Sequence, residues 1–152
     1  MNTDVMDDLN YSDTLLRHIL STVRTIALVG ASGDWKRPSF FAMKYLQRRG
    51  YRVIPVNPGR AGSKILGETV YAGLADIPGE IDMVDVFRAS EAALGVAEEA
   101  VALKEQKDIK VLWLQLGIRN DAAAELAEAA GIQVIMDRCP KIEYARLSGE
   151  LS

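Results

Sequence analysis

Small and basic residues follow directly after the first apolar segment of the chain. The apolar run Thr25–Val29 leads at once into Gly30-Ala31-Ser32-Gly33, and Arg37-Pro38-Ser39 comes a few residues later. Small residues let backbone amides approach a phosphate closely, and a helix that starts just behind them adds its positive end. A guanidinium can hold the same group with two parallel hydrogen bonds. The pattern therefore predicts a phosphate-binding loop.

A second basic group lies after the next apolar segment. Tyr51–Val56 is followed by Asn57-Pro58-Gly59-Arg60, and Lys64 comes slightly later. Residues 34–64 hold eight basic residues and one acidic residue, although the whole chain has a net charge of −3. Such a block indicates an anionic partner at one place on the surface. No aromatic-basic ribbon and no helix-turn-helix pattern accompanies it, which argues against nucleic acid.

The glycine spacing bears on which phosphate ligand fits. A dinucleotide fingerprint reads G-x-G-x-x-G and needs an acid near the end of the second strand to hold the ribose 2′-hydroxyl. Gly30 and Gly33 instead bracket two residues, and Val56-Asn57-Pro58 brings no carboxylate. This disfavours NAD. Arg60 and Lys64 place positive charge where an extra ribose phosphate would lie, which fits NADP or coenzyme A.

Five apolar segments alternate with helical patterns. Strands are expected at 25–29, 51–56, 82–87, 110–115 and 133–136. Helices are expected at about 13–23, 39–49, 90–106 and 120–130, the first three with Ser12, Ser39 and Ser90 as N-caps. This alternation predicts an α/β fold: a Rossmann-like doubly wound sheet of about five parallel strands, in three layers, with an extra N-terminal helix. Residues 12–152 are expected to form a single domain after an N-terminal tail, residues 1–11.

In such a sheet the ligand lies beyond the carboxyl ends of the strands, where the strand order reverses. Gln115 ends the fourth strand and Cys139 follows the fifth, so both are candidates for that edge. The chain's one histidine, His18, precedes the first strand, so a buried structural role suits Cys139 better than a nucleophilic one. Asp82 and Asp85 lie three apart on a strand and should point to opposite faces, which argues against a shared acid–base role.

Composition excludes several protein classes. One cysteine and one histidine rule out an internal disulfide and cysteine- or histidine-rich metal sites. No run of eighteen apolar residues is present, and the acidic N-terminus lacks the apolar segment of a signal peptide. We therefore expect a cytoplasmic protein that does not enter a membrane.

Five segments together carry a family resemblance. They are Val29-Gly-Ala-Ser32 with Arg37-Pro-Ser39, then Pro55-Val-Asn-Pro58, Ile81-Asp-Met-Val-Asp-Val-Phe-Arg88, Trp113-Leu-Gln-Leu-Gly-Ile118 and Asp137-Arg-Cys-Pro140. In this order they resemble the stand-alone CoA-binding domain proteins, which are similar to the CoA-binding domain of the succinyl-CoA synthetase alpha subunit. The likeness covers about residues 22–145. It implies a Rossmann-like fold and coenzyme A or an acyl-CoA as the ligand.

The resemblance also implies where the ligand lies. The CoA phosphates would lie on Val29–Ser32, the nucleotide beside Arg60, and the adenosine and pantetheine along Val86–Arg88. Combined with the loop analysis, the expected binding residues are Val29, Gly30, Ala31, Ser32, Arg37, Pro38, Ser39, Asn57, Pro58, Arg60, Lys64, Val86, Phe87, Arg88, Gln115 and Cys139.

The expected function is binding without chemistry. The synthetase's second domain, with its phosphohistidine, and its partner subunit have no counterpart here. We therefore expect a carrier, sensor or accessory module for CoA or an acyl-CoA. The alternative is a small NADP-dependent oxidoreductase or another nucleotide-dependent enzyme. A homodimer, or a complex with another protein, is compatible with the sequence.

Overall fold

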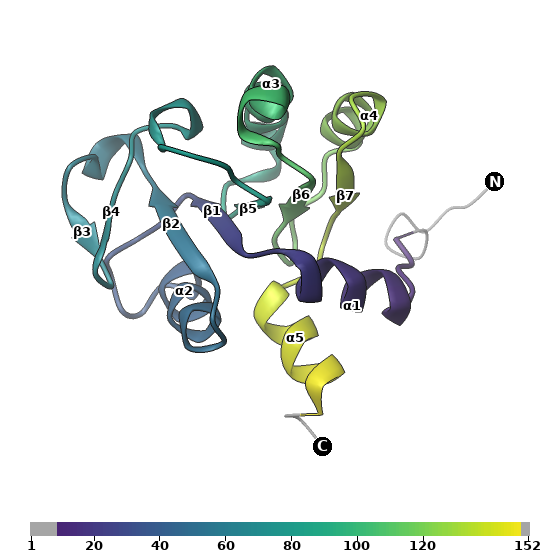
Figure 1. Ribbon diagram of the computed structural model, residues 1–152, viewed down its shortest axis with the longest axis horizontal. Coiled ribbons are helices and arrows are strands. Elements are labelled where there is room, and N and C mark those ends of the chain that lie inside the picture. The colour runs from purple at the N-terminus through teal and green to yellow at the C-terminus, as the bar shows by residue number, and fades with distance from the viewer. Residues whose placement is uncertain (1–8, 150–152) are drawn as a thin grey trace.

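A five-stranded parallel sheet forms the centre of the protein (Figure 1). The computed structural model describes residues 9–149. The strands are β1 (Thr25–Val29), β2 (Arg52–Val56), β5 (Met83–Val86), β6 (Val111–Leu114) and β7 (Gln133–Ile135). Their order is β2-β1-β5-β6-β7, and all neighbouring pairs are parallel. The strand order reverses between β1 and β5, so the predicted doubly wound sheet is confirmed.

Helices cover both faces of the sheet. In Figure 1, α3 (Ser90–Lys107) and α4 (Asp121–Ala129) lie above it, while α1 (Asp13–Thr22), α2 (Pro38–Arg48) and α5 (Pro140–Ser148) lie below. Two short 3₁₀ turns, η1 (Pro58–Arg60) and η2 (Leu74–Asp76), lie in the connections. The three layers and the extra N-terminal helix agree with the prediction.

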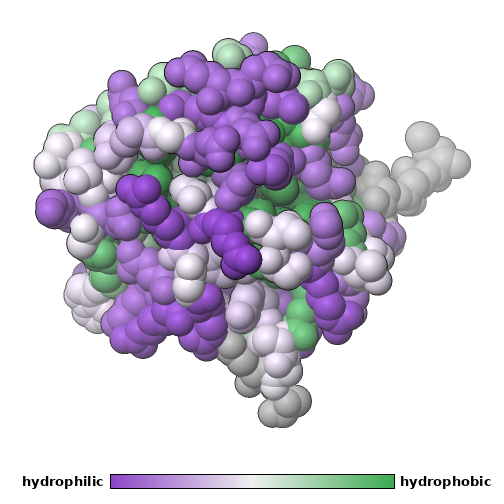
Figure 2. Space-filling view, viewed as in Figure 1, coloured by the Kyte–Doolittle hydropathy of each residue, from purple (hydrophilic) through white to green (hydrophobic). Residues whose placement is uncertain are grey.

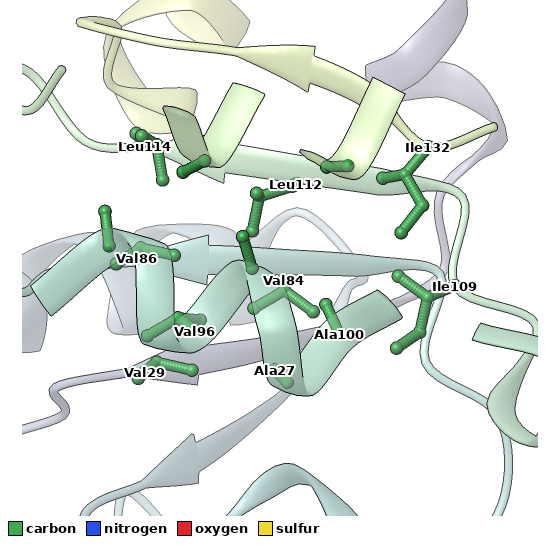
Figure 3. Close-up of a cluster of buried hydrophobic side chains, with 14 of the residues drawn as sticks. Ala27, Val29, Val84, Val86, Val96, Ala100, Ile109, Leu112, Leu114 and Ile132 are labelled. Atoms are coloured by element: carbon green, nitrogen blue, oxygen red, sulfur yellow. The ribbon is translucent and has the colours of Figure 1, made fainter. Parts of the chain in front are cut away.

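Both sheet faces bury apolar side chains, as continuous apolar strands require. Figure 3 shows the face toward α3, where alternate residues of three strands meet the helix: Ala27, Val29, Val84, Val86, Leu112 and Leu114. The residues between them, such as Leu28 and Trp113, pack toward α1, α2 and α5. The face of the molecule seen in Figure 2 is mainly hydrophilic, with small hydrophobic patches between the polar side chains.

Helix starts differ from the prediction in two places. Ser12 caps α1 as expected, because its hydroxyl oxygen accepts the Leu15 amide. Ser39 is not the cap of α2: Arg37 is, because Pro38 supplies the fixed φ that suits the first helical position. Ser90 likewise lies inside α3, whose cap is Ala89.

Two strands and one helix were not expected at all. A short antiparallel pair, β3 (Lys64–Ile65) and β4 (Glu68–Thr69), follows β2, and α5 follows β7. Of the expected N-terminal tail, residues 1–8 lie outside the described residues. Leu9 is buried, and the Tyr11 hydroxyl accepts the Met136 amide of the sheet. Within residues 9–149, no helix combines the length and apolar character needed to cross a bilayer.

Candidate functional site

A cavity of about 650 Å³ opens at the carboxyl ends of β1, β5 and β6, where the strand order reverses. Its volume lies within the range of small-molecule sites. Loops from four strands and the start of α2 line it, with Gly30, Ala31, Ser32, Arg37, Pro38, Ser39, Asn57, Phe87, Arg88, Ala89, Gln115, Leu116 and Ile118. The sheet therefore brings ten of the sixteen predicted residues to one place.

Gly30 is required at the floor of this cavity. Its φ is +90°, and a Cβ built there would lie 2.9 Å from the carbonyl carbon of Phe87. A side chain would force apart the loops after β1 and β5, in a backbone conformation that L-residues rarely adopt. The absence of a side chain keeps these two loops together.

The loop after β1 uses part of its backbone for internal bonds. The amides of Gly30 and Ala31 both donate to the Val56 carbonyl, at 3.0 and 3.2 Å. Asn57 ties the same loops together, because its Nδ2 donates to the Ala31 carbonyl at 2.8 Å. These amides are therefore not available to a phosphate.

The next two amides of that loop are the ones that a phosphate can use. Within residues 9–149, no hydrogen bond occupies the amides of Ser32 and Gly33. The Ser32 hydroxyl oxygen accepts the Asp34 amide at 3.0 Å and keeps its own proton to donate. Of these two residues, Ser32 lines the cavity.

The cavity has a positive electrostatic environment. Arg37 and Arg88 are among its lining residues, and α2 and α3 both begin there. Helix N-termini carry partial positive charge, so both add to the attraction for an anion. Asp34 lies 3.9 Å from Arg37 as an exposed ion pair, which contributes little at the surface.

Gln115 presents an unused acceptor in this cavity. Its Oε1 is buried and has no hydrogen-bond partner, while its backbone amide donates to Val86. An unpartnered buried acceptor costs free energy until a donor reaches it. A ligand that carries an N–H or O–H group would satisfy it.

The loop after β6 is held from below by Asp137. The Asp137 Oδ1 accepts the Gly117 amide at 2.6 Å, and its own amide donates to the Ile118 carbonyl. Ser90 braces the loop from the other side, since its hydroxyl accepts the Arg119 amide at 3.2 Å. The apolar wall formed by Leu116 and Ile118 is therefore fixed in position.

Six predicted binding residues do not line the cavity. Val29 and Val86 are buried in the core on the face toward α3. Pro58 and Arg60 lie on η1 and Lys64 on β3, exposed and beside the cavity. Cys139 is buried as the N-cap of α5. Whether any of the sixteen residues binds a ligand stays a prediction.

Three lining residues were not predicted. Ala89, Leu116 and Ile118 complete the wall beside Phe87 and Gln115. Their position directly after β5 and β6 could have predicted them, because these loops lie at the carboxyl edge of the sheet where the strand order reverses. The prediction included Phe87, Arg88 and Gln115 at this edge but not the apolar residues that follow them.

The two strand aspartates have opposite environments. Asp82 accepts the amides of Arg24 and Thr25 and the ammonium of Lys110. Burial raises its pKa, but these bonds outweigh burial and hold the pKa below the usual value. Asp85 is fully buried with both oxygens unpartnered, and burial raises its pKa well above the usual range. Neither residue lines the cavity.

Metal chemistry finds no support in residues 9–149, which contain no group of three or more histidine, cysteine, aspartate or glutamate side chains suited to a metal ion.

Comparison with known proteins identifies the family. The model of the CoA binding domain matches residues 24–145. The chain belongs to this CoA-binding domain family. YneT of Bacillus subtilis (strain 168) is 39% identical over 136 residues, which are 90% of this chain and 96% of YneT.

Solved structures of similar proteins share the whole architecture. A Thermus thermophilus protein, cell-free ID.343, is 39% identical with a TM-score of 0.84, covering 90% of this chain and 99% of that one. A hypothetical protein from Pyrococcus horikoshii OT3 is 36% identical with a TM-score of 0.85, covering 92% and 94%. The predicted resemblance to CoA-binding domain proteins is thus confirmed.

Proposed function

We propose that this CoA-binding domain holds coenzyme A or an acyl-CoA in the cavity at the carboxyl ends of β1, β5 and β6. The observation that carries the proposal is the cavity itself, at the reversal of strand order, with two arginine residues and two helix starts around it. The pyrophosphate would lie at the amides of Ser32 and Gly33, close to Arg37. Family membership supports CoA as the nucleotide.

The order of the strands supports a direction for the ligand. Arg60 and Lys64 follow β2, on one side of the phosphate loop, and Gln115 and Leu116 follow β6, on the other. The adenosine 3′-phosphate would therefore lie toward Arg60. The pantetheine would then run across Phe87 toward β6, where an amide N–H can donate to the buried Gln115 Oε1.

The side chains around the cavity support a binding role without chemistry. No carboxylate, histidine, cysteine, lysine or tyrosine is among the residues that line it, and arginine is the only ionisable type. Arginine keeps its proton at all ordinary pH values, so it cannot act as a general base. The protein would act as a carrier, a sensor or an accessory module for another protein.

Titration calorimetry with CoA, dephospho-CoA, NADP and NAD tests the proposal. We expect CoA to bind most tightly. Arg60→Ala should weaken CoA about tenfold, because a charge-assisted bond contributes about 1.5–3 kcal/mol, and leave dephospho-CoA within about twofold. Arg48→Ala, an exposed arginine near the far end of α2, is the matched control. Equal binding of NAD and CoA would refute the proposal, and tighter NADP binding would favour an oxidoreductase.

A further inference from the structure

We infer that a second cavity, at the opposite end of the strands, binds an organic monoanion with an apolar body. The cavity has a volume of about 480 Å³, large enough for a small molecule. It lies where the chain enters β1 and β2, between the last turns of α1, α2 and α5. Its lining residues are Arg17, Leu20, Ser21, Val23, Arg24, Arg49, Gly50, Tyr51, Tyr144, Leu147 and Ser148. The inference does not depend on what the first cavity binds.

One part of the second cavity is apolar and aromatic. Leu20 and Val23 are buried there. The rings of Tyr51 and Tyr144 meet edge to face with centroids 6.0 Å apart. The Tyr51 hydroxyl donates to the Leu20 carbonyl, and burial raises its pKa to about 12, so the phenol stays neutral. These groups can contact the body of a ligand but cannot neutralise a charge.

The other part of the cavity is cationic. Arg17 and Arg24 reach it from α1 and from the segment before β1, and Arg49 also lies over the Tyr45 ring at 4.3 Å. Among the residues that the structure describes, no acidic side chain lines the cavity. Within residues 9–149, neither Arg17 nor Arg24 forms an ion pair.

The nearest carboxylates are committed to other partners. Asp13 and Glu143 both pair with Arg146, at 3.0 and 2.8 Å. Asp82 is held by backbone amides and by Lys110. Asp13 also acts on Arg17 at longer range, one helical turn away, but neither Arg17 nor Arg24 has a carboxylate within ion-pair distance among residues 9–149.

The helix ends oppose an anion in this cavity, and they oppose a double negative charge more than a single one, so the arginine side chains must outweigh this field. The last turns of α1, α2 and α5 surround the cavity, and helix C-termini carry partial negative charge. This field opposes a phosphate dianion more than a monoanion. A planar guanidinium suits a carboxylate, which it can hold with two parallel bonds. The ligand class is accordingly a carboxylate attached to an aliphatic or aromatic body.

Anilinonaphthalene sulfonate is the probe for this site, because it is an aromatic monoanion whose fluorescence rises in an apolar environment. We expect saturable binding of one molecule per chain, reversed by octanoate and unaffected by saturating CoA. The double variant Arg17→Gln/Arg24→Gln should weaken binding at least about tenfold, the loss of one charge-assisted bond or more. Arg48→Gln, which makes the same change on α2 outside the cavity, should stay within about twofold.

A blocking variant keeps the test decisive if the double variant does not fold. Ser21 is exposed at the cavity rim, where its hydroxyl donates to the His18 carbonyl, so Ser21→Tyr fills the space without disturbing the core. It should abolish octanoate-sensitive fluorescence while circular dichroism stays unchanged. Unaltered binding in Ser21→Tyr, or displacement of the probe by CoA, would overturn the inference.

Discussion

Replacing Asp85 by leucine should stabilise the protein. The Asp85 carboxyl is fully buried on β5, in register with Leu28 and Trp113, which are also fully buried. Neither carboxyl oxygen has a hydrogen-bond partner. Leucine branches at the same carbon and has the same number of heavy atoms beyond Cβ, so it fills the space without unpartnered oxygens.

The gain in unfolding free energy from Asp85→Leu has one part that is the same at every pH and one part that depends on pH. An unsatisfied buried polar group costs about 1–3 kcal/mol, which leucine recovers at every pH. Burial raises the pKa of Asp85 in the folded protein, whereas the unfolded chain keeps about 3.9. Between these two pKa values the folded state binds a proton that the unfolded state lacks. The wild-type free energy of unfolding therefore falls by about 1.4 kcal/mol per pH unit as pH rises through this window.

Urea unfolding of wild type, Asp85→Leu and Asp85→Asn from pH 4 to 8 measures both parts. Asp85→Leu should be at least about 2 kcal/mol more stable than wild type at pH 7, and its advantage should shrink toward pH 4. In Asp85→Asn the unfolding free energy should lose the pH dependence that Asp85 causes. This variant should keep part of the cost of burying unpartnered polar atoms. A leucine variant that is less stable than wild type, or an advantage that is the same at every pH, would refute the reasoning.

Three further predictions concern the first cavity. Gly30→Ala should cost at least about 2 kcal/mol of unfolding free energy in urea, because its φ of +90° and the Phe87 backbone both oppose a side chain; unchanged stability would contradict this. Gln115→Leu should lower the affinity for CoA about threefold to tenfold in calorimetry. It should also raise the unfolding free energy by about 1 kcal/mol, since it removes an unpartnered acceptor. An unaltered affinity would show that Gln115 is not part of the site. Asp137→Ala should free the Gly117 amide and speed hydrogen exchange in residues 115–118. It should lower the unfolding free energy by about 1–3 kcal/mol. Exchange protection at the wild-type level would show that this hydrogen bond does not hold the loop.

The sheet could be predicted because buried parallel strands appear as continuous apolar runs between helical patterns. The position of the first cavity followed from strand order alone, and most polar and basic lining residues were found in that way. The N-caps of α2 and α3 were assigned to Ser39 and Ser90 because serine is a frequent cap. Pro38 instead fixes the start of α2 one residue earlier than expected, and Ser90 is the first helical residue of α3.

Other features depend on contacts that the sequence does not display. The strands β3 and β4 have two residues each, too few for an alternating pattern. The helix α5 buries Glu143, which pairs with Arg146. This charged residue interrupts the apolar face of the helix, so the sequence pattern does not indicate a helix there. The second cavity draws on three helices that are distant in sequence, and no single segment indicates it.

The ion pair between Asp13 and Arg146 brings the start of α1 to the last turn of α5. The first and the last helix of the described residues therefore meet beside the sheet, while the first cavity opens at the carboxyl ends of the strands. The segment before α1 runs to the carboxyl end of β7, where the Tyr11 hydroxyl accepts the Met136 amide and the Leu9 carbonyl accepts Arg138, so a fusion partner attached after α5 would lie farther from that opening. The closeness of α1 and α5 suits circular permutation, in which a linker connects α5 to α1 and the chain is opened at the exposed Gly67 between β3 and β4. This architecture makes the domain a portable unit that can be inserted into longer chains without rebuilding its binding edge.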